Sequence, residues 1–215
     1  CMSLYVAMQA IALHRREPEL RRAQLEGRWT YIHPRHPSKT CVGVMGLGVL
    51  GLDCARTLLG LGFTVAGWSR TPKPDLGFPS LAGGDGLEEF QRQVDCYVLL
   101  LPITPATERI VDRTFLARAK PGATLINVGR GGLVDDDALV EALDGDRLGH
   151  AVLDVFRTEP LPAGHRFWRH PRITITPHNS SGTDPATALV QVVANVRRAL
   201  AGERPENLVD LSRGY

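Results

Sequence analysis

The sequence predicts an α/β fold, a doubly wound parallel sheet, and three observations support this fold class. From residue 41 onward, apolar runs with strand character alternate with stretches whose apolar residues recur at helical spacing. Most strand candidates are continuous apolar runs, which is typical of a parallel sheet that helices cover on both faces. The first run leads into Gly46-x-Gly48-x-x-Gly51 and then into a helical stretch. This alternation predicts right-handed crossovers between parallel strands.

Residues 1–26 are predicted to be helical. Pro18 is expected to start a second helical segment after Arg16, and Gly27 is expected to end it. The apolar residues that recur at helical spacing in the first segment are Leu4, Met8, Ile11 and Ala12.

Residues 28–40 are predicted to be a surface connection. This stretch contains His33 and His36, each followed by a proline. Two histidines can bind a metal ion, but these two have no further ligands beside them. A solvated loop is therefore the better interpretation.

The elements predicted from residue 41 onward follow one another in a regular order. The strand candidates are 41–45, 63–68, 95–101, 123–128, 149–155 and 172–176. The helix candidates are 49–61, 86–93, 112–119, 135–144 and 185–201. Asp135 is a predicted N-cap, and Asp136 and Asp137 in the first turn complement the helix dipole. Three consecutive aspartates could also hold a metal ion, but capping explains them better, and no metal site is predicted.

The glycine-rich turn has the strand-turn-helix context that a dinucleotide-binding fingerprint requires. Gly46 permits the tight turn, Gly48 lets the backbone approach a pyrophosphate, and Gly51 lets the helix pack closely on the strand. The N-terminus of the helix that follows offers free N–H groups and a positive dipole end to an anion. The sequence therefore predicts a Rossmann-type site for a dinucleotide, with a purely structural turn as the alternative.

The end of the second predicted strand favours NADP(H) over NAD(H). An NAD site carries an acid about twenty residues past the glycines, where it binds the ribose 2′-hydroxyl. Here the strand ends in Ser69-Arg70-Thr71, with no carboxylate, and Lys73 follows. A guanidinium and two hydroxyls suit a 2′-phosphate. The alternative is an ordinary polar turn before Pro72.

Three polar residues follow three of the later predicted strands. Arg130 comes after strand 123–128, Glu159 after strand 149–155, and His178 after strand 172–176. In open α/β sheets, ligands bind at the carboxyl ends of the strands, so these three residues are expected at one crevice. An arginine, a carboxylate and a histidine are the groups that reduction of a carbonyl requires.

An ordered set of motifs resembles the D-isomer-specific 2-hydroxyacid dehydrogenases. The resemblance spans residues 41–178, and lighter similarity extends over both ends. The motifs that carry it are Leu99-Leu-Leu-Pro102-Ile-Thr104-Pro, Asn127-Val-Gly-Arg130-Gly, Leu153-Asp-Val-Phe156, Glu159-Pro-Leu-Pro162 and Thr176-Pro-His178. Within the family, Trp68-Ser-Arg-Thr71 and the ending Arg213-Gly-Tyr215 are most similar to the glyoxylate/hydroxypyruvate reductase branch, which uses NADPH.

The resemblance implies NADPH-dependent reduction of a small 2-keto acid, glyoxylate or hydroxypyruvate, to the 2-hydroxy acid. Arg130 would bind the substrate carboxylate and polarise the keto oxygen, His178 would donate the proton, and Glu159 would orient His178. Asp154 would contact the nicotinamide carboxamide. The residues implied to bind the cofactor are Gly46, Gly48, Val49, Leu50, Gly51, Ser69, Arg70, Thr71, Leu101, Pro102, Thr104, Val128, Gly129, Arg130, Asp154 and His178.

Two alternatives to this function remain open. One is another 2-hydroxyacid dehydrogenase, such as a phosphoglycerate-dehydrogenase-like enzyme. The other is a dinucleotide-sensing binding module without turnover, which could keep all three polar residues.

Composition and the resemblance also lead to expectations about partners and location. The net charge of +2 gives no case for binding nucleic acid or an acidic membrane. No apolar run reaches membrane-spanning length. The four cysteines form no CxxC pair, and Cys41 and Cys96 fall in predicted strands, as is typical of a reducing compartment. We expect a cytoplasmic protein, and the resemblance implies a homodimer.

The resemblance divides the chain into three parts. Residues 1–40 would be an interdomain helix and connection, 41–184 the dinucleotide-binding domain, and 185–215 the returning helix and tail of a substrate domain. Most of an N-terminal substrate domain is expected to be missing, and Cys1 is not an initiator residue, so we expect a fragment with poor turnover. A smaller departure from the family is Asn179-Ser-Ser-Gly182 after His178, where small apolar residues are more usual.

Overall fold

The structure of the chain, a computed structural model, describes residues 1–182 and 185–208. Residues 2–180 form one compact unit, and the residues from 181 onward form a second unit together with Cys1. The ending Arg213-Gly-Tyr215, which contributes to the resemblance above, lies outside the described residues.

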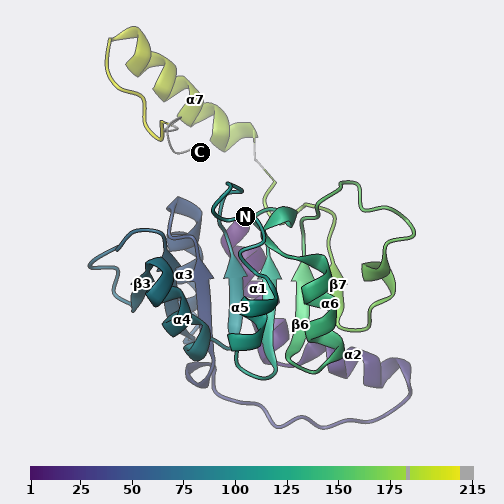
Figure 1. The fold of residues 1–215 in the computed structure, drawn as a ribbon. Helices are drawn as coiled ribbons and strands as arrows, with labels where there is room; N and C mark the ends of the chain where they lie inside the picture. Colours follow the sequence, from purple (N-terminus) through teal and green to yellow (C-terminus); the bar gives the residue numbers. More distant parts are fainter. Residues whose placement is uncertain (183–184, 209–215) are drawn as a thin grey trace. The chain divides into compact units, whose positions relative to one another are not determined.

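The first unit is built on a seven-stranded sheet in which all neighbouring strands are parallel (Figure 1). The predicted doubly wound α/β fold is therefore confirmed. The strand order is β3-β2-β1-β4-β5-β6-β7. The strands are β1 (Cys41–Met45), β2 (Thr64–Ser69), β3 (Ser80–Ala82), β4 (Cys96–Leu99), β5 (Ala123–Asn127), β6 (Leu148–Leu153) and β7 (Ile173–Ile175).

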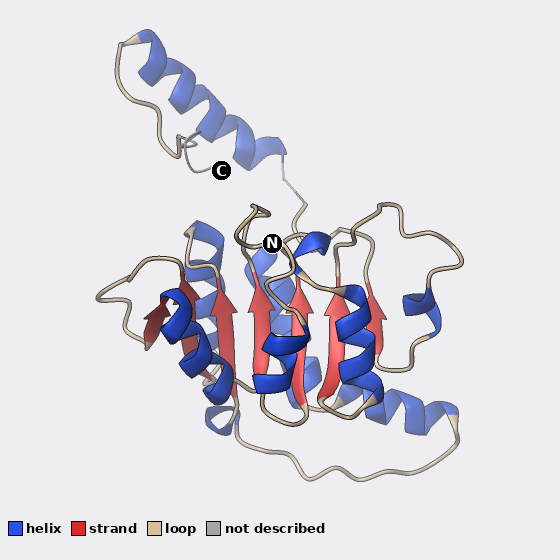
Figure 2. Ribbon diagram, in the orientation of Figure 1, coloured by secondary structure: helices blue, strands red, loops and turns tan. Residues whose placement is uncertain are grey.

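Helices cover both faces of this sheet, and each face has its own hydrophobic cluster (Figure 2). On one face, α1 (Met2–His14) and α3 (Val49–Gly60) pack on side chains such as Val44 and Val98. On the other face, α4 (Gly83–Gln93), α5 (Arg113–Arg118) and α6 (Asp136–Asp144) pack on side chains such as Tyr97 and Leu99. Successive residues of one strand therefore point to opposite clusters, which explains why the strands are continuous apolar runs.

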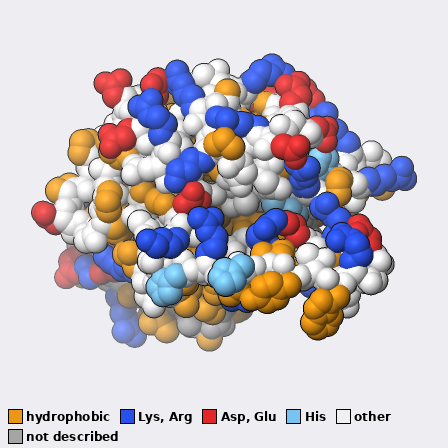
Figure 3. All heavy atoms as spheres, turned by 90° about the horizontal axis from the view of Figure 1, so that it is seen from below, with side chains coloured by type: hydrophobic (Ala, Val, Ile, Leu, Met, Phe, Trp, Pro, Cys, Tyr) orange, Lys and Arg blue, Asp and Glu red, His pale blue; other side chains and the backbone are white. Residues whose placement is uncertain are grey.

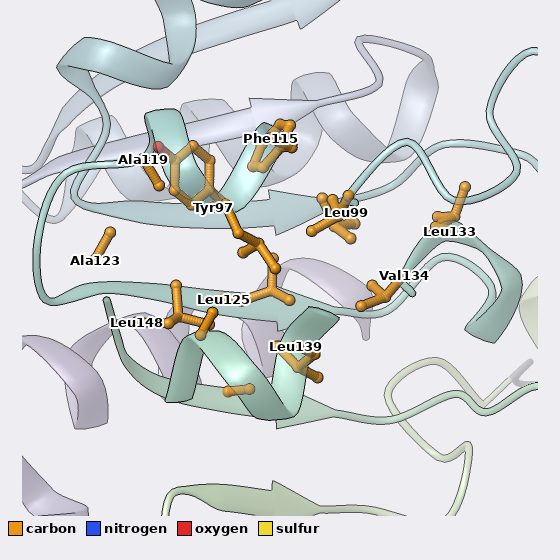
Figure 4. Packing of buried hydrophobic residues seen from close by; sticks show 14 of the residues in the cluster. Tyr97, Leu99, Phe115, Ala119, Ala123, Leu125, Leu133, Val134, Leu139 and Leu148 are labelled. Carbon is orange, nitrogen blue, oxygen red and sulfur yellow. The ribbon is translucent and has the colours of Figure 1, made fainter. Parts of the chain in front are cut away.

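The second of these clusters is packed around an aromatic group (Figure 4). Tyr97 of β4 and Phe115 of α5 meet edge to face, with ring centroids 5.2 Å apart. The buried Tyr97 hydroxyl donates a hydrogen bond to the Gln91 carbonyl oxygen over 2.6 Å, so the ring is buried without an unsatisfied polar atom. Leu125 of β5 and Leu139 of α6 are fully buried in the same cluster.

The predicted helix over residues 1–26 is two helices, α1 and α2 (Glu17–Leu25), and Pro18 lies in the first turn of α2 as expected. The break falls at Arg16, which has a left-handed backbone with φ 56°. The face of α1 that packs on the sheet differs from the residues whose spacing predicts the helix. Leu4, Met8 and Ile11 are 72%, 54% and 40% exposed, while the packed face consists of Met2, Val6, Ala10 and Leu13.

The structure corrects several other boundaries of the predicted elements. Strand 95–101 ends at Leu99 and strand 149–155 ends at Leu153, so Asp154 lies in the turn that follows. Helix 86–93 begins earlier, at Gly83. Strand β3 has three residues and was not predicted. The N-cap prediction is confirmed, because Asp135 Oδ1 accepts hydrogen bonds from the backbone N–H groups of residues 137 and 138.

Short 3₁₀ helices occupy three of the connections. They cover Pro37–Lys39, Gly131–Leu133 and Arg166–Arg169. The first lies in the predicted connection 28–40, where the His36 side chain hydrogen-bonds to Ser38. The second follows Arg130 and shapes the candidate site.

Three of the four cysteines are buried or half-buried thiols in the first unit. No disulfide links the cysteines, all four of which lie within the described residues. Burial raises the pKa of Cys54 and of Cys96 to about 12. These thiols therefore stay protonated at neutral pH and pack as small apolar groups.

The second unit contains α7 (Pro185–Leu200), as predicted for residues 185–201. Leu189, Val190 and Val196 on this helix are exposed. None of the helices within the described ranges is both long and apolar enough to cross a bilayer.

Candidate active site

The register of the sheet brings the carboxyl ends of the central strands to one edge. Met45 pairs with Leu99, Leu99 with Asn127, Asn127 with Leu153, and Leu153 with Ile175. The connections that follow these residues therefore start side by side. The strand order reverses between β1 and β4, because β2 and β3 lie on one side of β1 and the later strands on the other. Such a switch point is where open α/β sheets bind ligands.

The glycine-rich turn lies between β1 and α3, at this switch point. Gly46 has φ 105°, a backbone that favours glycine, and a Cβ there would lie 2.7 Å from the Leu100 carbonyl oxygen. A Cβ on Gly51 would lie 1.8 Å from the Gly46 carbonyl oxygen, so only glycine permits this approach of helix and turn. Gly48 is the N-cap of α3, and a Cβ there would meet nothing within 4 Å.

This geometry suits a bound pyrophosphate. The open space beside Gly48 and the free N–H groups of the first turn of α3 form a cradle for an anion. Val49 and Leu50, which were predicted to bind the cofactor, begin the helix and are exposed.

The predicted 2′-phosphate site follows β2, next to the glycine-rich turn. Ser69 is buried at the end of β2, and its hydroxyl donates a hydrogen bond to the Thr71 carbonyl oxygen over 2.8 Å. Arg70 and Thr71 are exposed. Arg70 therefore lies at the surface, and the Ser69 hydroxyl holds the backbone of the turn.

The segment after β4 carries three of the predicted cofactor residues. Leu101 is buried, and Pro102 and Thr104 are half-buried. The Thr107 hydroxyl donates to the Pro102 carbonyl oxygen over 2.7 Å and accepts from the Thr104 N–H over 2.8 Å. These two hydrogen bonds fix the turn in which Pro102 and Thr104 lie.

The turn after β5 presents Arg130 and is held by the buried side chain of Asn127. The Asn127 amide nitrogen donates to the Arg130 carbonyl oxygen over 3.0 Å, and its amide oxygen accepts from the Gly129 N–H over 3.2 Å. Gly131 packs against the chain after β6, where a Cβ would lie 2.0 Å from the Phe156 carbonyl carbon. Arg130 itself is exposed, and its guanidinium donates to the Gly129 carbonyl oxygen over 2.7 Å.

His178 and Glu159 meet at the same edge, although they follow different strands. His178 Nδ1 lies 2.6 Å from Glu159 Oε2, and Glu159 Oε1 accepts a hydrogen bond from the Phe156 N–H over 2.8 Å. With its Nδ1 engaged by the carboxylate, the imidazole directs its Nε2 away from Glu159. His178 has a left-handed backbone, with φ 52°. Non-glycine residues in this region are uncommon and often lie at functional sites.

Electrostatics link Glu159 to both other polar residues of the candidate site. Burial raises the pKa of Glu159, but the hydrogen bonds from His178 and Phe156 and the positive charges of His178 and Arg130 together lower it below its usual range. Glu159 is therefore a carboxylate at neutral pH.

Asp154 lies directly after β6 and is fully buried. Its Oδ1 accepts hydrogen bonds from the Thr176 hydroxyl over 2.5 Å and from the Asn179 N–H over 3.0 Å, and its Oδ2 accepts from the Ser180 N–H over 3.0 Å. Burial raises the pKa of Asp154, but these hydrogen bonds and one from the Ser180 hydroxyl lower it below its usual range. The carboxylate holds the turn that carries His178, and its contact with a nicotinamide stays a prediction.

Two residues that shape this edge were not predicted. Tyr5 of α1 has its hydroxyl 2.5 Å from Thr176 Oγ1, and no local motif around Tyr5 indicates that contact. Asn127 closes a motif of the resemblance, but its role in holding the Arg130 turn becomes visible only when its two hydrogen bonds are seen.

A hollow lies at the opposite edge of the sheet, where the strands begin. It encloses about 620 Å³ between the starts of β4, β5 and β6, helix α2 and the extended segment 32–35. Figure 3 views this face from below and shows Lys, Arg and His side chains gathered on it. None of the predicted site residues lines it, so the carboxyl-end edge is the candidate active site. Across residues 1–182 and 185–208, no three His, Cys, Asp or Glu side chains are grouped so that they could hold a metal ion.

Comparisons with known proteins agree with this geometry. The family described as "D-isomer specific 2-hydroxyacid dehydrogenase, NAD binding domain" matches residues 7–180. The chain is 40% identical over 214 residues to glyoxylate/hydroxypyruvate reductase A of Serratia proteamaculans (strain 568), covering 100% of this chain and 68% of that protein.

Two solved structures are similar over the whole chain. One is a D-isomer specific 2-hydroxyacid dehydrogenase from Xanthobacter autotrophicus Py2 in complex with NADPH and MES, with 43% identity, a TM-score of 0.96, and coverage of 100% of this chain and 88% of that one. The other is an NADPH-dependent glyoxylate/hydroxypyruvate reductase from Sinorhizobium meliloti in complex with NADP and sulfate, with 35% identity, a TM-score of 0.95, and coverage of 100% and 69%.

Proposed function

The chain belongs to the D-isomer specific 2-hydroxyacid dehydrogenase family, and we propose that it carries the cofactor site and the catalytic residues of an NADPH-dependent reductase of glyoxylate or hydroxypyruvate. The observation that carries this proposal is the contact of 2.6 Å between His178 Nδ1 and Glu159 Oε2 at the sheet edge that also presents Arg130 and the glycine-rich turn. Relatives named as this reductase add support.

In the proposed reaction, the glycine-rich turn and the Ser69-Arg70-Thr71 turn would hold NADPH, which would supply a hydride to the carbonyl carbon of the keto acid. Arg130 binds the substrate carboxylate and polarises the keto oxygen, because a fixed cation in a cleft stabilises the negative charge that develops there. His178 donates a proton from Nε2 to the same oxygen. Glu159 keeps the ring oriented through its contact with Nδ1.

The residues at the end of β2 support a preference for NADPH. No carboxylate occupies the Ser69-Arg70-Thr71 turn, and a guanidinium suits a phosphate better than a ribose hydroxyl. The two similar structures described above contain NADPH or NADP. We therefore assign the 2′-phosphate to this turn, with Arg70 as its main contact.

The remaining proposals concern organisation. Residues 1–40 serve as interdomain helix and connection, 41–184 as the dinucleotide-binding domain, and 185–215 as the returning part of a substrate domain. Leu4, Met8 and Ile11 expose the outer face of α1, and burial of this face against a second copy would form a homodimer. The protein acts in the cytoplasm.

The test measures NADPH binding and NADPH oxidation separately. Binding is followed by the fluorescence of the reduced nicotinamide, and oxidation by its absorbance, with glyoxylate and with hydroxypyruvate. We expect tighter binding of NADPH than of NADH, and keto-acid-dependent oxidation that His178→Gln slows about 10²–10⁴-fold. In the full-length protein, tight NADPH binding without oxidation of NADPH by either acid would contradict the reductase and favour a sensor, and a preference for NADH would contradict the role of Arg70.

A further inference from the structure

A chain of hydrogen bonds connects helix α1 to the turn that carries the candidate catalytic histidine. The Tyr5 hydroxyl lies 2.5 Å from Thr176 Oγ1, and Thr176 Oγ1 lies 2.5 Å from Asp154 Oδ1. Tyr5 and Thr176 are 171 positions apart in the sequence. The contact therefore joins the first helix of the unit to the end of its last strand.

The chemistry of the three groups decides which of them donates and which accepts in each hydrogen bond. An ionised carboxylate only accepts hydrogen bonds, so the single hydroxyl proton of Thr176 points to Asp154. Thr176 Oγ1 must then accept the proton of Tyr5. Burial, the largest influence, raises the pKa of Tyr5, so the hydroxyl remains a donor throughout the neutral range.

At the other end of this series of hydrogen bonds, Asp154 holds the backbone of the turn that carries His178. The Asp154 carboxylate accepts from the N–H groups of Asn179 and Ser180, which follow the histidine. Its backbone carbonyl oxygen accepts from the His178 N–H over 2.8 Å. Because His178 has a left-handed backbone, its conformation depends on these external hydrogen bonds rather than on local preference.

We propose that Tyr5 is a positioning residue for His178, acting through Thr176 and Asp154. When Tyr5 donates to Thr176, the threonine hydroxyl stays oriented toward Asp154. The Asp154 carboxylate then stays where it accepts hydrogen bonds from the turn that carries His178. Without that donor, the Thr176 hydroxyl gains freedom to rotate, and the turn loses one of the contacts that hold the imidazole against Glu159. This role rests on the proposed function, in which His178 is the proton donor.

The experiment compares Tyr5→Phe with Tyr97→Phe. Each variant removes one tyrosine hydroxyl that is hydrogen-bonded inside the unit. Tyr97 donates to Gln91 and lies in the hydrophobic cluster on the other face of the sheet, away from the His178 turn. Tyr97→Phe therefore reports the cost of losing a buried hydroxyl without disturbing the candidate site.

The readouts separate positioning from stability. We expect Tyr5→Phe to lower kcat about three- to tenfold, the range that corresponds to one hydrogen bond of ordinary net strength, and to displace the pH profile of kcat. The Kd for NADPH should change less than twofold. Tyr97→Phe should lower the Tm at least as much as Tyr5→Phe and leave kcat and its pH profile unchanged. Thr176→Val, which removes the hydrogen bonds to both Tyr5 and Asp154, should lower kcat at least as much as Tyr5→Phe does.

A readout independent of turnover is the set of NMR signals of the His178 ring, which report its contact with Glu159. They should move in Tyr5→Phe and stay in place in Tyr97→Phe. If the full-length wild-type protein binds NADPH but reduces neither acid, while the ring signals move in Tyr5→Phe alone, the proposed reaction fails and the positioning role stands. Unchanged kcat, pH profile and ring signals in Tyr5→Phe, or equal changes in Tyr97→Phe, would overturn the inference.

Discussion

Replacing Gly51 by alanine should disable the dinucleotide site while a matched replacement in the same helix does not. The Cβ of an alanine at Gly51 would lie 1.8 Å from the Gly46 carbonyl oxygen and 2.9 Å from its carbon. An ordinary carbon–oxygen contact is about 3.4 Å, so the helix and the turn would have to separate by roughly 1.5 Å. Both clashing atoms belong to the backbone, and no side-chain rotation relieves the clash.

The size of the effect follows from this geometry. Overpacking of a well-packed site costs about 1–3 kcal/mol, which in a unit of this size lowers the Tm by about 2–4 °C per kcal/mol. The separation also moves the N–H groups of the first turn of α3 away from the pyrophosphate position. We expect the affinity for NADPH, measured by nicotinamide fluorescence, to fall more than tenfold.

Gly60 provides the control. It is the last residue of α3, and a Cβ there would meet nothing within 4 Å. Alanine is favoured over glycine inside a helix by up to about 1 kcal/mol, so Gly60→Ala should keep or raise the Tm and bind NADPH as the wild type does. Wild-type NADPH affinity in Gly51→Ala, or an equal loss in Gly60→Ala, would refute the reasoning about this turn.

Three further predictions concern catalysis, stability and cofactor choice. His178→Gln should lower kcat about 10²–10⁴-fold with little change in the Kd for NADPH, since general acid catalysis contributes that much; a change in Kd alone would contradict the assignment. Burial and, after it, the charges of Arg22 and His170 lower the pKa of His150 to about 4, so between pH 6.5 and pH 4 the unfolded state takes up a proton that the folded state does not. The free energy of unfolding should therefore fall by up to about 3 kcal/mol as the pH is lowered from 6.5 to 4. In urea denaturation, His150→Gln should show a smaller fall over the same pH range, and an equal fall would contradict the lowered pKa of His150. Arg70→Ser should reduce the affinity for NADPH relative to NADH at least tenfold in fluorescence titrations, and an unchanged ratio would remove Arg70 from the 2′-phosphate site.

The local order of elements could be predicted from the sequence because each signal is local. The strand, the glycine turn and helix α3 are read from adjacent residues, and the same holds for the Asp135 cap. Strand β3 escaped prediction because three residues are too few to show a period. The packed face of α1 escaped it for another reason. Apolar residues occur on several sides of that helix, so periodicity predicts a helix without choosing which side meets the sheet.

The candidate site, too, could be predicted from the sequence only in part. Residues that directly follow a strand, such as Arg130 and His178, could be placed at one edge because parallel strands share their direction. The contact of Glu159 with His178 was expected only from the resemblance. Tyr5 could not be predicted, because its hydrogen bond depends on how a helix from the start of the chain packs beside the last strand.

Helix α1 is held on the sheet by packing and by a hydrogen bond. The first unit therefore does not depend on the covalent connection between α1 and the sheet to stay together. Val6, Ala10 and Leu13 bury α1 against the sheet, and the Tyr5 hydroxyl fastens it to Thr176, whereas residues 28–36 run exposed or half-buried without helix or strand. A protease that cuts within this segment would leave two pieces that remain associated. In this respect the unit is a natural candidate for fragment complementation, in which a peptide covering α1 and α2 rebuilds the His178 turn on a chain that begins at the first strand.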